Sequence, residues 1–337
     1  MITLGRIRRA GLAIVAVAAV SLVGACGSDT ENPSGAAASG ASDGKVETPQ
    51  VSVAVFPSFN ALGAQAAKAD GSFDSAGLTV TLATIATPAE GLPQLLGGKV
   101  QFALMDLTVP AVARTKGVPL TLVAPGAKGT APKDNFGVGN LWVKADSPIK
   151  TMKDVQNATF GIPQINSQIW VDIRSVVDEA GGDSSKIKFV EVPNTLSALK
   201  AGNVEVTTTS EPAGTAALAD PSIRVLGGYT AAGGDLAYAY VTTQEFAKKN
   251  PNTVKAFEEA ILKGNTTVNT DPAKRSEVAA SYIKAPKALL DKAHYPEFSV
   301  EPISEANVQT ALDRLMKYGL LDKAKAPKAA DLVFAGK

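Results

Sequence analysis

Short apolar runs alternate with amphipathic segments along most of the chain between residues 50 and 242. The runs are rich in Val, Ile, Leu and Phe, which favour strands, and the segments between them carry apolar residues at helical spacing. Strands that alternate with helices predict an α/β fold with mostly parallel sheets and helices on both faces of each sheet. We expect the strands at residues 51–56, 78–82, 102–105, 120–124, 141–144, 159–162, 189–192, 204–209, 224–226 and 237–242.

One unit of this pattern occurs twice. Residues 196–217 read as a short helix that ends at Gly202, a strand, and a second helix that begins after Ser210. Residues 95–112 repeat the same order, with Gly98 in the place of Gly202 and Asp106 in the place of Ser210. A glycine ends a helix readily because it adopts positive φ without strain. Two copies of one unit predict two similar lobes with a working cleft between them.

The chain after Thr243 is predicted to be helical. Val254, Phe257 and Ile261 share one helix face, so the late helices have an apolar side that packs on the first lobe. That packing makes the first lobe discontinuous, and the two crossings between lobes form a hinge of two strands. The expected division is a signal peptide over 1–25, a tether over 26–49, lobe one over 50–142 and 243–337, and lobe two over 143–242.

The N-terminus has the pattern of an export signal. Arg6, Arg8 and Arg9 precede an apolar run from Ala10 to Val23, which is too short to span a bilayer comfortably. The small residues before Cys26 resemble the lipobox of bacterial lipoproteins, which implies a diacylglycerated thiol at the mature N-terminus and an acylated, palmitate-type anchor. The alternative is a transmembrane helix beside a spare thiol. The residues that follow are rich in Ser, Gly and Ala without periodicity, which predicts a flexible tether.

Composition and charge narrow the function classes. The whole chain carries +1 and the three early arginines are its only charges before Cys26, so the remainder carries −2. This balance argues against a nucleic-acid partner, which needs a concentrated basic face. One cysteine and one histidine exclude internal disulfides and Cys/His zinc sites. We expect no metal, no cofactor and no catalytic residue: a Ser–His–Asp triad would need His294, far along the chain from the cleft loops, and no phosphate-binding glycine motif occurs.

Candidate binding residues follow from the rule that ligands in open α/β sheets sit outside the carboxyl ends of the strands, at helix starts. Asp106 and Glu211 are the only acids in these loops, and either meets a cationic or donor-rich part of a ligand or serves as a helix cap or a solvated rim. The Asn and Ser residues before a helix are equally explained as caps. The predicted ligand-binding residues are Ser58, Phe59, Asn60, Thr87, Asp106, Leu107, Gln164, Asn166, Ser167, Gln168, Ser210, Glu211 and Tyr238.

Several segments, taken in order, resemble the solute-binding lipoproteins of ABC importers in the sulfonate, taurine, nitrate and thiamine-pyrimidine group. The segments that carry the resemblance are 74–80, 96–103, 146–155, 198–205, 211–212, 246–251 and 318–321. One departure is Gln101, where the family usually shows an acid. The resemblance implies a periplasmic-binding-protein-like fold of type II.

The same resemblance implies a monomeric receptor outside the cytoplasmic membrane that closes on a small solute and delivers it to a membrane permease with its ATPase. The solute stays open among a sulfonate, nitrate, an aromatic acid, a pyrimidine or an amine. Closure requires a solute that contacts both lobes. Two other classes remain: an enzyme of the thiamine-pyrimidine-synthase type on the same fold, and a surface lipoprotein that acts as a sensor or by protein contact.

Overall fold

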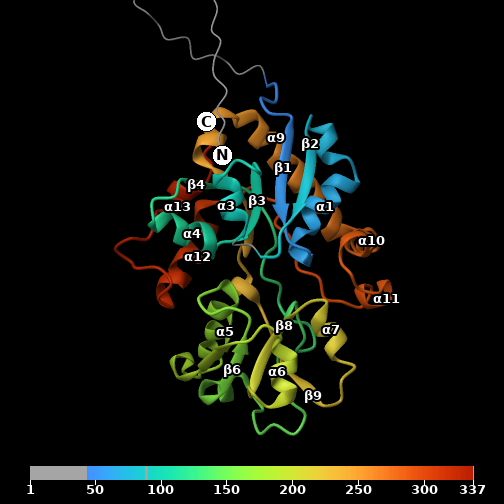
Figure 1. The fold of residues 1–337 in the computed structure, drawn as a ribbon, viewed down its shortest axis with the longest axis vertical. Helices are drawn as coiled ribbons and strands as arrows, with labels where there is room; N and C mark the ends of the chain where they lie inside the picture. Colours follow the sequence, from blue (N-terminus) through green and yellow to red (C-terminus); the bar gives the residue numbers. More distant parts are fainter. Residues whose placement is uncertain (1–43, 88–89, 337) are drawn as a thin grey trace, which may run out of the picture. The chain divides into compact units, whose positions relative to one another are not determined.

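Two sheets form the framework of the computed structural model, which describes residues 44–87 and 90–336 (Figure 1). The predicted signal peptide, Cys26 and most of the tether lie outside the described residues. Within them, each sheet has five strands. The first sheet has, in spatial order, β2 (Thr79–Thr84), β1 (Gln50–Val55), β3 (Phe102–Asp106), β10 (Tyr238–Thr243) and β4 (Leu120–Pro125). The second has β7 (Lys188–Glu191), β6 (Thr159–Ile162), β8 (Val206–Ser210), β5 (Gly139–Lys144) and β9 (Ile223–Tyr229).

The two sheets have the same topology, which explains the repeated unit in the sequence. In the first sheet β1 pairs in parallel with β2 and β3, and β10 is antiparallel to β3 and β4. In the second sheet β6 pairs in parallel with β7 and β8, and β5 is antiparallel to β8 and β9. The antiparallel strand is in each case the one that enters from the other sheet. The α/β prediction with mostly parallel sheets is confirmed.

The repeated units occupy equivalent places. Helix α3 (Gly91–Leu96) leads through Gly98 at φ 67° into β3, and α6 (Thr195–Ala201) ends at Gly202 at φ 79° before β8. Each of these strands is central in its sheet and is followed by a helix, α4 (Thr108–Thr115) or α7 (Ala213–Ala217). Both helices therefore begin at the carboxyl end of a central strand, where a binding site is expected.

The late helices pack on the first sheet, as their apolar faces predicted. Phe257 of α9 (Pro251–Thr270) stacks on Phe102 of β3 with ring centroids 4.0 Å apart, and Val308, Leu312 and Leu315 of α12 (Glu305–Lys317) join the same core. The other helices of this lobe, which we call lobe one, are η1 (Phe59–Ala61), α1 (Leu62–Ala69), α2 (Ser72–Ser75), α8 (Gln244–Lys249), α10 (Pro272–Tyr282), α11 (Lys287–Leu290) and α13 (Ala329–Leu332).

Lobe two, built on the second sheet, has its own core. Phe160 and Val206 of the sheet pack with Ile173 and Val177 of α5 (Gln168–Glu179), the long helix predicted from its apolar stripe. Its short helices are η3 (Met152–Asn157) and η4 (Ser184–Lys186). Both lobes belong to one compact unit that spans residues 42–337.

Two crossing segments join the lobes, residues 126–138 between β4 and β5 and residues 230–237 between β9 and β10. The second contains η5 (Ala231–Gly234). The segments pair where they leave lobe one, since the Gly129 N–H donates to the Asp235 carbonyl and the Ala237 N–H donates to the Ala127 carbonyl. The change of sheet therefore falls before Gly139 and before Tyr238, a few residues earlier than the expected borders after 142 and 242. An antiparallel strand pairs with the lobe it enters, and the sequence does not show this pairing.

No helix within the described residues is long and apolar enough to cross a membrane.

Candidate functional site

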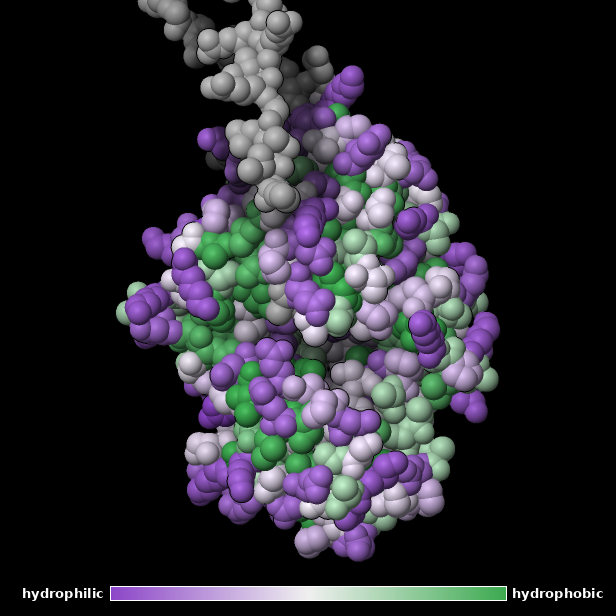
Figure 2. All heavy atoms as spheres, in the orientation of Figure 1, coloured by the Kyte–Doolittle hydropathy of each residue, from purple (hydrophilic) through white to green (hydrophobic). Residues whose placement is uncertain are grey.

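The lobes meet at the starts of α4 and α5. Thr108 Oγ1 of lobe one donates a hydrogen bond to Gln168 Oε1 of lobe two across 3.2 Å, and both side chains are buried. Thr108 comes two residues after the end of β3 and Gln168 follows the loop after β6, so the carboxyl ends of an inner strand from each sheet lie close together. Figure 2 shows the surface hollowed between the two lobes. The predicted loops around Asp106 and Ser167 are thus brought to one place.

Asp106 lies at the lobe-one side of this contact. Its Oδ1 accepts a hydrogen bond from the Thr108 N–H, the first N–H of α4, at 2.9 Å, although the N-cap residue of this helix is Leu107 rather than Asp106. Burial raises the pKa of the Asp106 carboxyl, against hydrogen bonds from Thr108 and Val109 that lower it. Tyr238 is the direct partner of Asp106 in the antiparallel pair of β3 and β10. Two predicted residues far apart in sequence are therefore adjacent.

Tyr238 stands at the end of the second crossing segment. It is half-buried, and its ring lies 5.8 Å from the Phe56 ring at a tilt of 46°. Its hydroxyl makes no hydrogen bond to any residue that the structure describes. Burial raises the pKa of this hydroxyl, and the nearby charges of Asp106 and Asp172 raise it further. A phenol has an aromatic face and a hydroxyl donor, so Tyr238 is able to contact a solute in both ways.

Glu211 forms a second contact between the lobes. Its carboxylate accepts from Thr215 Oγ1 at 2.9 Å in lobe two, and the backbone N–H of His294 in lobe one lies near enough to lower its pKa. The side chain is only 6% exposed, so the alternative of a solvated rim is wrong for Glu211. Burial raises the pKa of Glu211 to about 7 despite these contacts.

His294 lies beside the cleft, although its distance along the sequence placed it elsewhere. Its ring meets Phe136 edge-on with centroids 5.0 Å apart, and the neighbouring Tyr295 stacks on Phe59 at 4.2 Å. The segment that contains His294 and Tyr295, which precedes α12 in lobe one, therefore lies beside the Glu211 loop of lobe two. Among the described residues, no side-chain hydrogen bond joins the His294 ring to a serine or a carboxylate.

A third contact joins α5 to the end of α12. Tyr318 donates from its hydroxyl to Asp178 Oδ2 at 2.9 Å, and the Arg174 guanidinium lies 5.0 Å from the Tyr318 ring centroid. The same guanidinium donates to the Tyr318 carbonyl at 3.4 Å. Among the described residues, these three contacts join the two lobes.

The other predicted residues of lobe one have local roles. Ser58 caps η1 by accepting from the Asn60 N–H at 3.3 Å, and the Ser58 carbonyl accepts from the Tyr282 hydroxyl. Phe59 and Leu107 are core residues, 2% and 4% exposed. The structure gives these two a packing role in shaping the loops. Thr87 is exposed and its hydroxyl lies 3.4 Å from Glu90 Oε1.

The loop before α5 carries the predicted lobe-two residues. Ser167 caps the helix by accepting from the Trp170 N–H, and its own hydroxyl donates to the Gln164 carbonyl at 2.8 Å. Asn166 is exposed and adopts the left-handed conformation at φ 59°. This conformation turns the chain into the helix, and asparagine tolerates it better than most residues. Ser210, at the end of β8, is exposed.

Asp172 is a buried acid beside the Thr108–Gln168 contact, and it was not predicted from the sequence. It lies one turn into α5, is 3% exposed, and its Oδ1 accepts from Gln168 Nε2 at 2.9 Å and from the Ala232 N–H at 2.8 Å. Burial raises the pKa of Asp172 to about 7, while the Arg314 charge lowers it and the Asp106 charge raises it. The signal was present, because Asp172 falls between Ile169 and Val176 on the apolar stripe of a helix, where a carboxylate needs partners.

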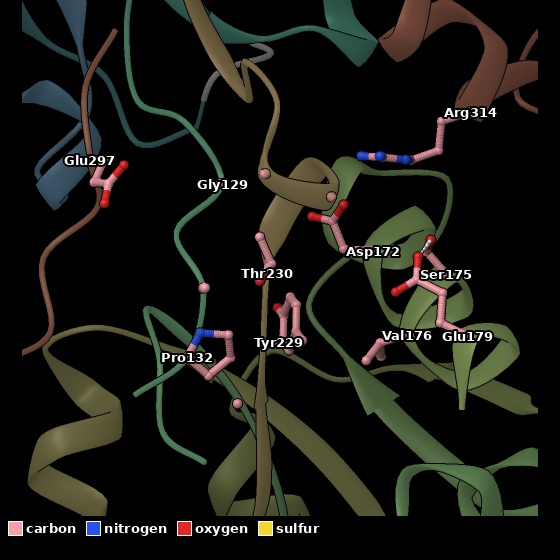
Figure 3. Close-up of a pocket in the computed structure, with 14 residues that line it drawn as sticks. Gly129, Pro132, Asp172, Ser175, Val176, Glu179, Tyr229, Thr230, Glu297 and Arg314 are labelled. Atoms are coloured by element: carbon pink, nitrogen blue, oxygen red, sulfur yellow. Dashed lines mark hydrogen bonds between the residues drawn. The ribbon is translucent and has the colours of Figure 1, made fainter. Parts of the chain in front are cut away.

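A cavity of about 660 Å³ lies beside the two crossing segments (Figure 3). Its walls come from both crossing segments, from the exposed side of α5 and from lobe one. The lining residues are Gly129, Ala131, Pro132, Asp172, Ser175, Val176, Glu179, Gly228, Tyr229, Thr230, Gly233, Gly234, Glu297 and Arg314. None of the residues predicted from the sequence is among them. Asp172 lines this cavity and also accepts a hydrogen bond from Gln168, the residue that bonds to Thr108.

The geometry is that of a two-lobed receptor. The starts of α4 and α5, a phenol and buried carboxylates lie where two bodies joined by two segments meet, and such an arrangement encloses a small molecule by closing. No group of three His, Cys, Asp or Glu within the described residues is placed to hold a metal ion.

Comparison with known families supports this class. A family model described as NMT1/THI5 like matches residues 58–275, more than half of the chain. The chain belongs to the NMT1/THI5-like family. A search of curated protein sequences finds no significant match.

Solved structures share the fold. The alkanesulfonate-binding protein SsuA from Xanthomonas axonopodis pv. citri, bound to MOPS, superposes with a TM-score of 0.69 at 18% identity, over 86% of this chain and 99% of that chain. The periplasmic aliphatic sulphonate binding protein SsuA from Escherichia coli gives 0.68 at 17% identity, over 86% and 98%. The periplasmic nitrate-binding protein NrtA from Synechocystis PCC 6803 gives 0.67 at 14% identity, over 86% of each chain. At these identities the likeness establishes the periplasmic-binding-protein fold.

Proposed function

We propose that this protein is the extracytoplasmic solute-binding component of an ABC importer. It captures a small solute between lobe one and lobe two and delivers it to a membrane permease and its ATPase. The observation that carries the proposal is the hydrogen bond from Thr108 to Gln168, because it brings the starts of α4 and α5 together across the lobes. Family membership and the fold of the sulfonate- and nitrate-binding neighbours support the same class.

The proposed contacts to the solute come from loops of both lobes. Lobe one contributes Ser58, Asn60, Thr87, Asp106 and Tyr238, and lobe two contributes Gln164, Asn166, Ser167, Gln168, Ser210 and Glu211. A solute that touches both sets binds the closed form more tightly than the open form, and this difference drives closure. The two lobes, divided at the crossing segments, are the bodies that move.

The buried carboxylates guide the choice of solute. Asp106 and Glu211 are each under 10% exposed, and burial raises the pKa of both. A solute that donates hydrogen bonds or carries a positive charge stabilises such groups, whereas a bare oxoanion is repelled by them when they are ionised. Among the solute classes left open by the sequence, this favours an amine or a donor-rich pyrimidine over nitrate.

A thermal-shift screen of the purified protein tests the proposal. The panel contains alkanesulfonates, nitrate, aromatic carboxylates, pyrimidines and amines. A ligand present at about one hundred times its dissociation constant adds about 2.7 kcal/mol to the free energy of unfolding, which is an easily measured shift. A panel in which no compound raises the melting temperature, together with turnover of one of its members, would favour the enzyme class instead.

The anchor at Cys26 is a separate part of the proposal. We expect the mature chain to begin at Cys26, to carry a lipid on its thiol and to sit on the extracytoplasmic face of the membrane. Labelling of expressing cells with radioactive palmitate tests this, with Cys26→Ser as the control. A labelled wild-type band and an unlabelled variant are the expected result, and a mature protein that retains its first 25 residues contradicts it.

A further inference from the structure

The cavity beside the crossing segments contains a guanidinium with unused hydrogen-bonding capacity. The Arg314 side chain is 16% exposed, and its one ion pair within the described residues is a long one, 3.8 Å from Nη2 to Asp235 Oδ2. No described residue accepts a hydrogen bond from it. A Cβ added to Gly233 would overlap this guanidinium, so the glycine allows it to lie against the backbone of the crossing segment. Figure 3 shows it directed from α12 toward Asp172.

Asp172 supplies the opposite charge in the same cavity. Both of its hydrogen bonds, from Gln168 and from Ala232, go to Oδ1, and Oδ2 accepts none from the described residues. Arg314 is near enough to lower the pKa of Asp172, yet its ion pair is with Asp235. The cavity thus separates a donor group and an acceptor oxygen that do not satisfy each other.

The cavity has further polar groups that can bind a guest with a positively charged end. Thr230 lines the cavity, and its hydroxyl makes no hydrogen bond to any residue that the structure describes, so it can bond to a guest. Glu179 and Glu297 also line the cavity, and both are exposed. Exposed carboxylates at a rim attract a cationic group and hold it weakly, because water screens them.

We propose that this cavity is a second small-molecule site, distinct from the solute cleft, and that it binds a zwitterion with a carboxylate and a protonated amine, as in an amino acid. The carboxylate accepts from the Arg314 guanidinium, which is shaped for two parallel hydrogen bonds to a carboxylate. The amine donates to Asp172 Oδ2 and to the Thr230 hydroxyl. A guest with both charges compensates both buried groups, whereas a guest with one charge leaves the other group unpaired.

The site is formed by both lobes. Arg314 and Glu297 belong to lobe one, Asp172 and Ser175 belong to lobe two, and Thr230 lies on the crossing segment between them. Any movement of the lobes changes the distance between the groups that hold the two charges. Binding in this cavity is therefore coupled to the position of the lobes, and by linkage to binding in the solute cleft.

Isothermal titration calorimetry of the purified protein tests the proposal at about pH 8, where Asp172 with its pKa of about 7 is ionised. The probes are glycine, β-alanine and γ-aminobutyrate, which carry both charges at increasing separation, and acetate and methylamine, which carry one each. We expect at least one zwitterion to bind at least about tenfold more tightly than both single-charge probes, since a charge-assisted hydrogen bond contributes that much.

Variants identify the site. Arg314→Gln is expected to weaken the zwitterion at least about tenfold, and Asp172→Asn and Thr230→Val to weaken it less. Lys323→Gln, which removes an exposed charge of the same sign outside the cavity, is the control and leaves binding unchanged. Arg314→Lys keeps the charge but loses the paired geometry, so we expect an intermediate loss of affinity. This variant replaces Arg314→Gln in the test if Arg314→Gln does not fold.

Two results overturn the proposal. One is that no zwitterion binds the wild-type protein. The other is that a zwitterion binds, is unaffected by Arg314→Gln, and is lost in Asp106→Asn combined with Glu211→Gln. That pattern places it in the solute cleft, which supports the proposed function while rejecting the second site. If instead no compound in the thermal-shift screen binds but a zwitterion still binds in an Arg314-dependent way, the second site is supported and the proposed function is not.

Discussion

Thr108 in lobe one and Gln168 in lobe two are joined by a hydrogen bond of 3.2 Å, and Gln168 in turn donates to Asp172 at 2.9 Å. Asp172 also holds the N–H of Ala232, which sits in the crossing segment at φ 50°, a conformation that is strained for a residue with a Cβ. A short chain of side chains therefore connects the cleft to the hinge. Changes at any of its members are expected to alter how the lobes move.

Removing the link between the lobes is expected to favour the open form. Thr108→Val keeps the shape of the side chain and loses the hydrogen bond, a change of about 1 kcal/mol or about fivefold in the ratio of closed to open protein. Spin labels at Leu96 of α3 and at Leu218, which follows α7, are both exposed and report the distance between the lobes in a Cys26→Ser background. Thr115→Val is the matched control, because Thr115 bonds only within α4. Identical distance distributions in Thr108→Val and wild type would reject the link.

The charge state of Asp172 is expected to make stability depend on pH. Its pKa is raised to about 7 in the folded protein, so the folded state binds the proton more tightly than the unfolded state does. The contribution of this proton to the free energy of unfolding is fully present below the ordinary pKa of an aspartate and is lost as the pH rises through 7. The free energy of unfolding falls by at most about 1.4 kcal/mol per pH unit over this range.

Urea unfolding at about pH 5 and about pH 8 measures this effect. Asp172→Asn keeps the acceptor oxygen for Gln168 and Ala232 and removes the titration. Relative to this variant, the wild-type protein loses stability between the two pH values. Glu211 has a pKa of about 7 from burial as well, so Glu211→Gln gives a second, independent difference of the same sign. Parallel pH curves for wild type and Asp172→Asn contradict the assignment.

The two acids of the cleft are expected to determine the choice of solute. Asp106→Asn combined with Glu211→Gln retains the acceptors for Thr108 and Thr215 and removes both charges. We expect the doubly substituted protein to unfold near the wild-type temperature and to lose or change the solute that the screen identifies. An unchanged dissociation constant for that solute would exclude these two residues as contacts.

The crossing segments are expected to tolerate very little added volume at one point. A Cβ at Gly129 would overlap the Ala231 carbonyl oxygen, so Gly129→Ala must displace one crossing segment from the other. We expect a loss of about 1–3 kcal/mol in the free energy of unfolding. Gly137→Ala is the control in the same segment, because its Cβ would meet Pro132 at an ordinary 3.4 Å. Equal melting temperatures for the two variants would show that the segments are not packed as described.

Much of the fold follows from local sequence features. The strands were predicted within a few residues, because β-branched runs and glycine stops are local signals, and the match of Gly98 with Gly202 revealed the two equivalent sheets. The predicted borders between the lobes fall a few residues too late, within β5 and β10, since they depend on which sheet an antiparallel strand joins. Long-range pairing of this kind is not encoded in the periodicity of one segment.

The site was predicted less completely. Asp106, Gln168 and Tyr238 were selected because the ends of strands in an open sheet converge, and the structure brings them together. Asp172 was missed because it lies within a helix, one turn beyond its start. Arg314 was missed, and His294 was expected far from the cleft, because both come from late segments that fold back on it. Their position depends on tertiary packing that no local pattern specifies.

Small-angle X-ray scattering of the purified protein, with and without the solute that the thermal-shift screen identifies, tests the central claim most directly. The account predicts that the solute decreases the radius of gyration of the wild-type protein and has no such effect on Asp106→Asn combined with Glu211→Gln. A solute that binds tightly while the radius of gyration of wild type and variant responds identically would contradict closure of the two lobes on a molecule held between Asp106 and Glu211.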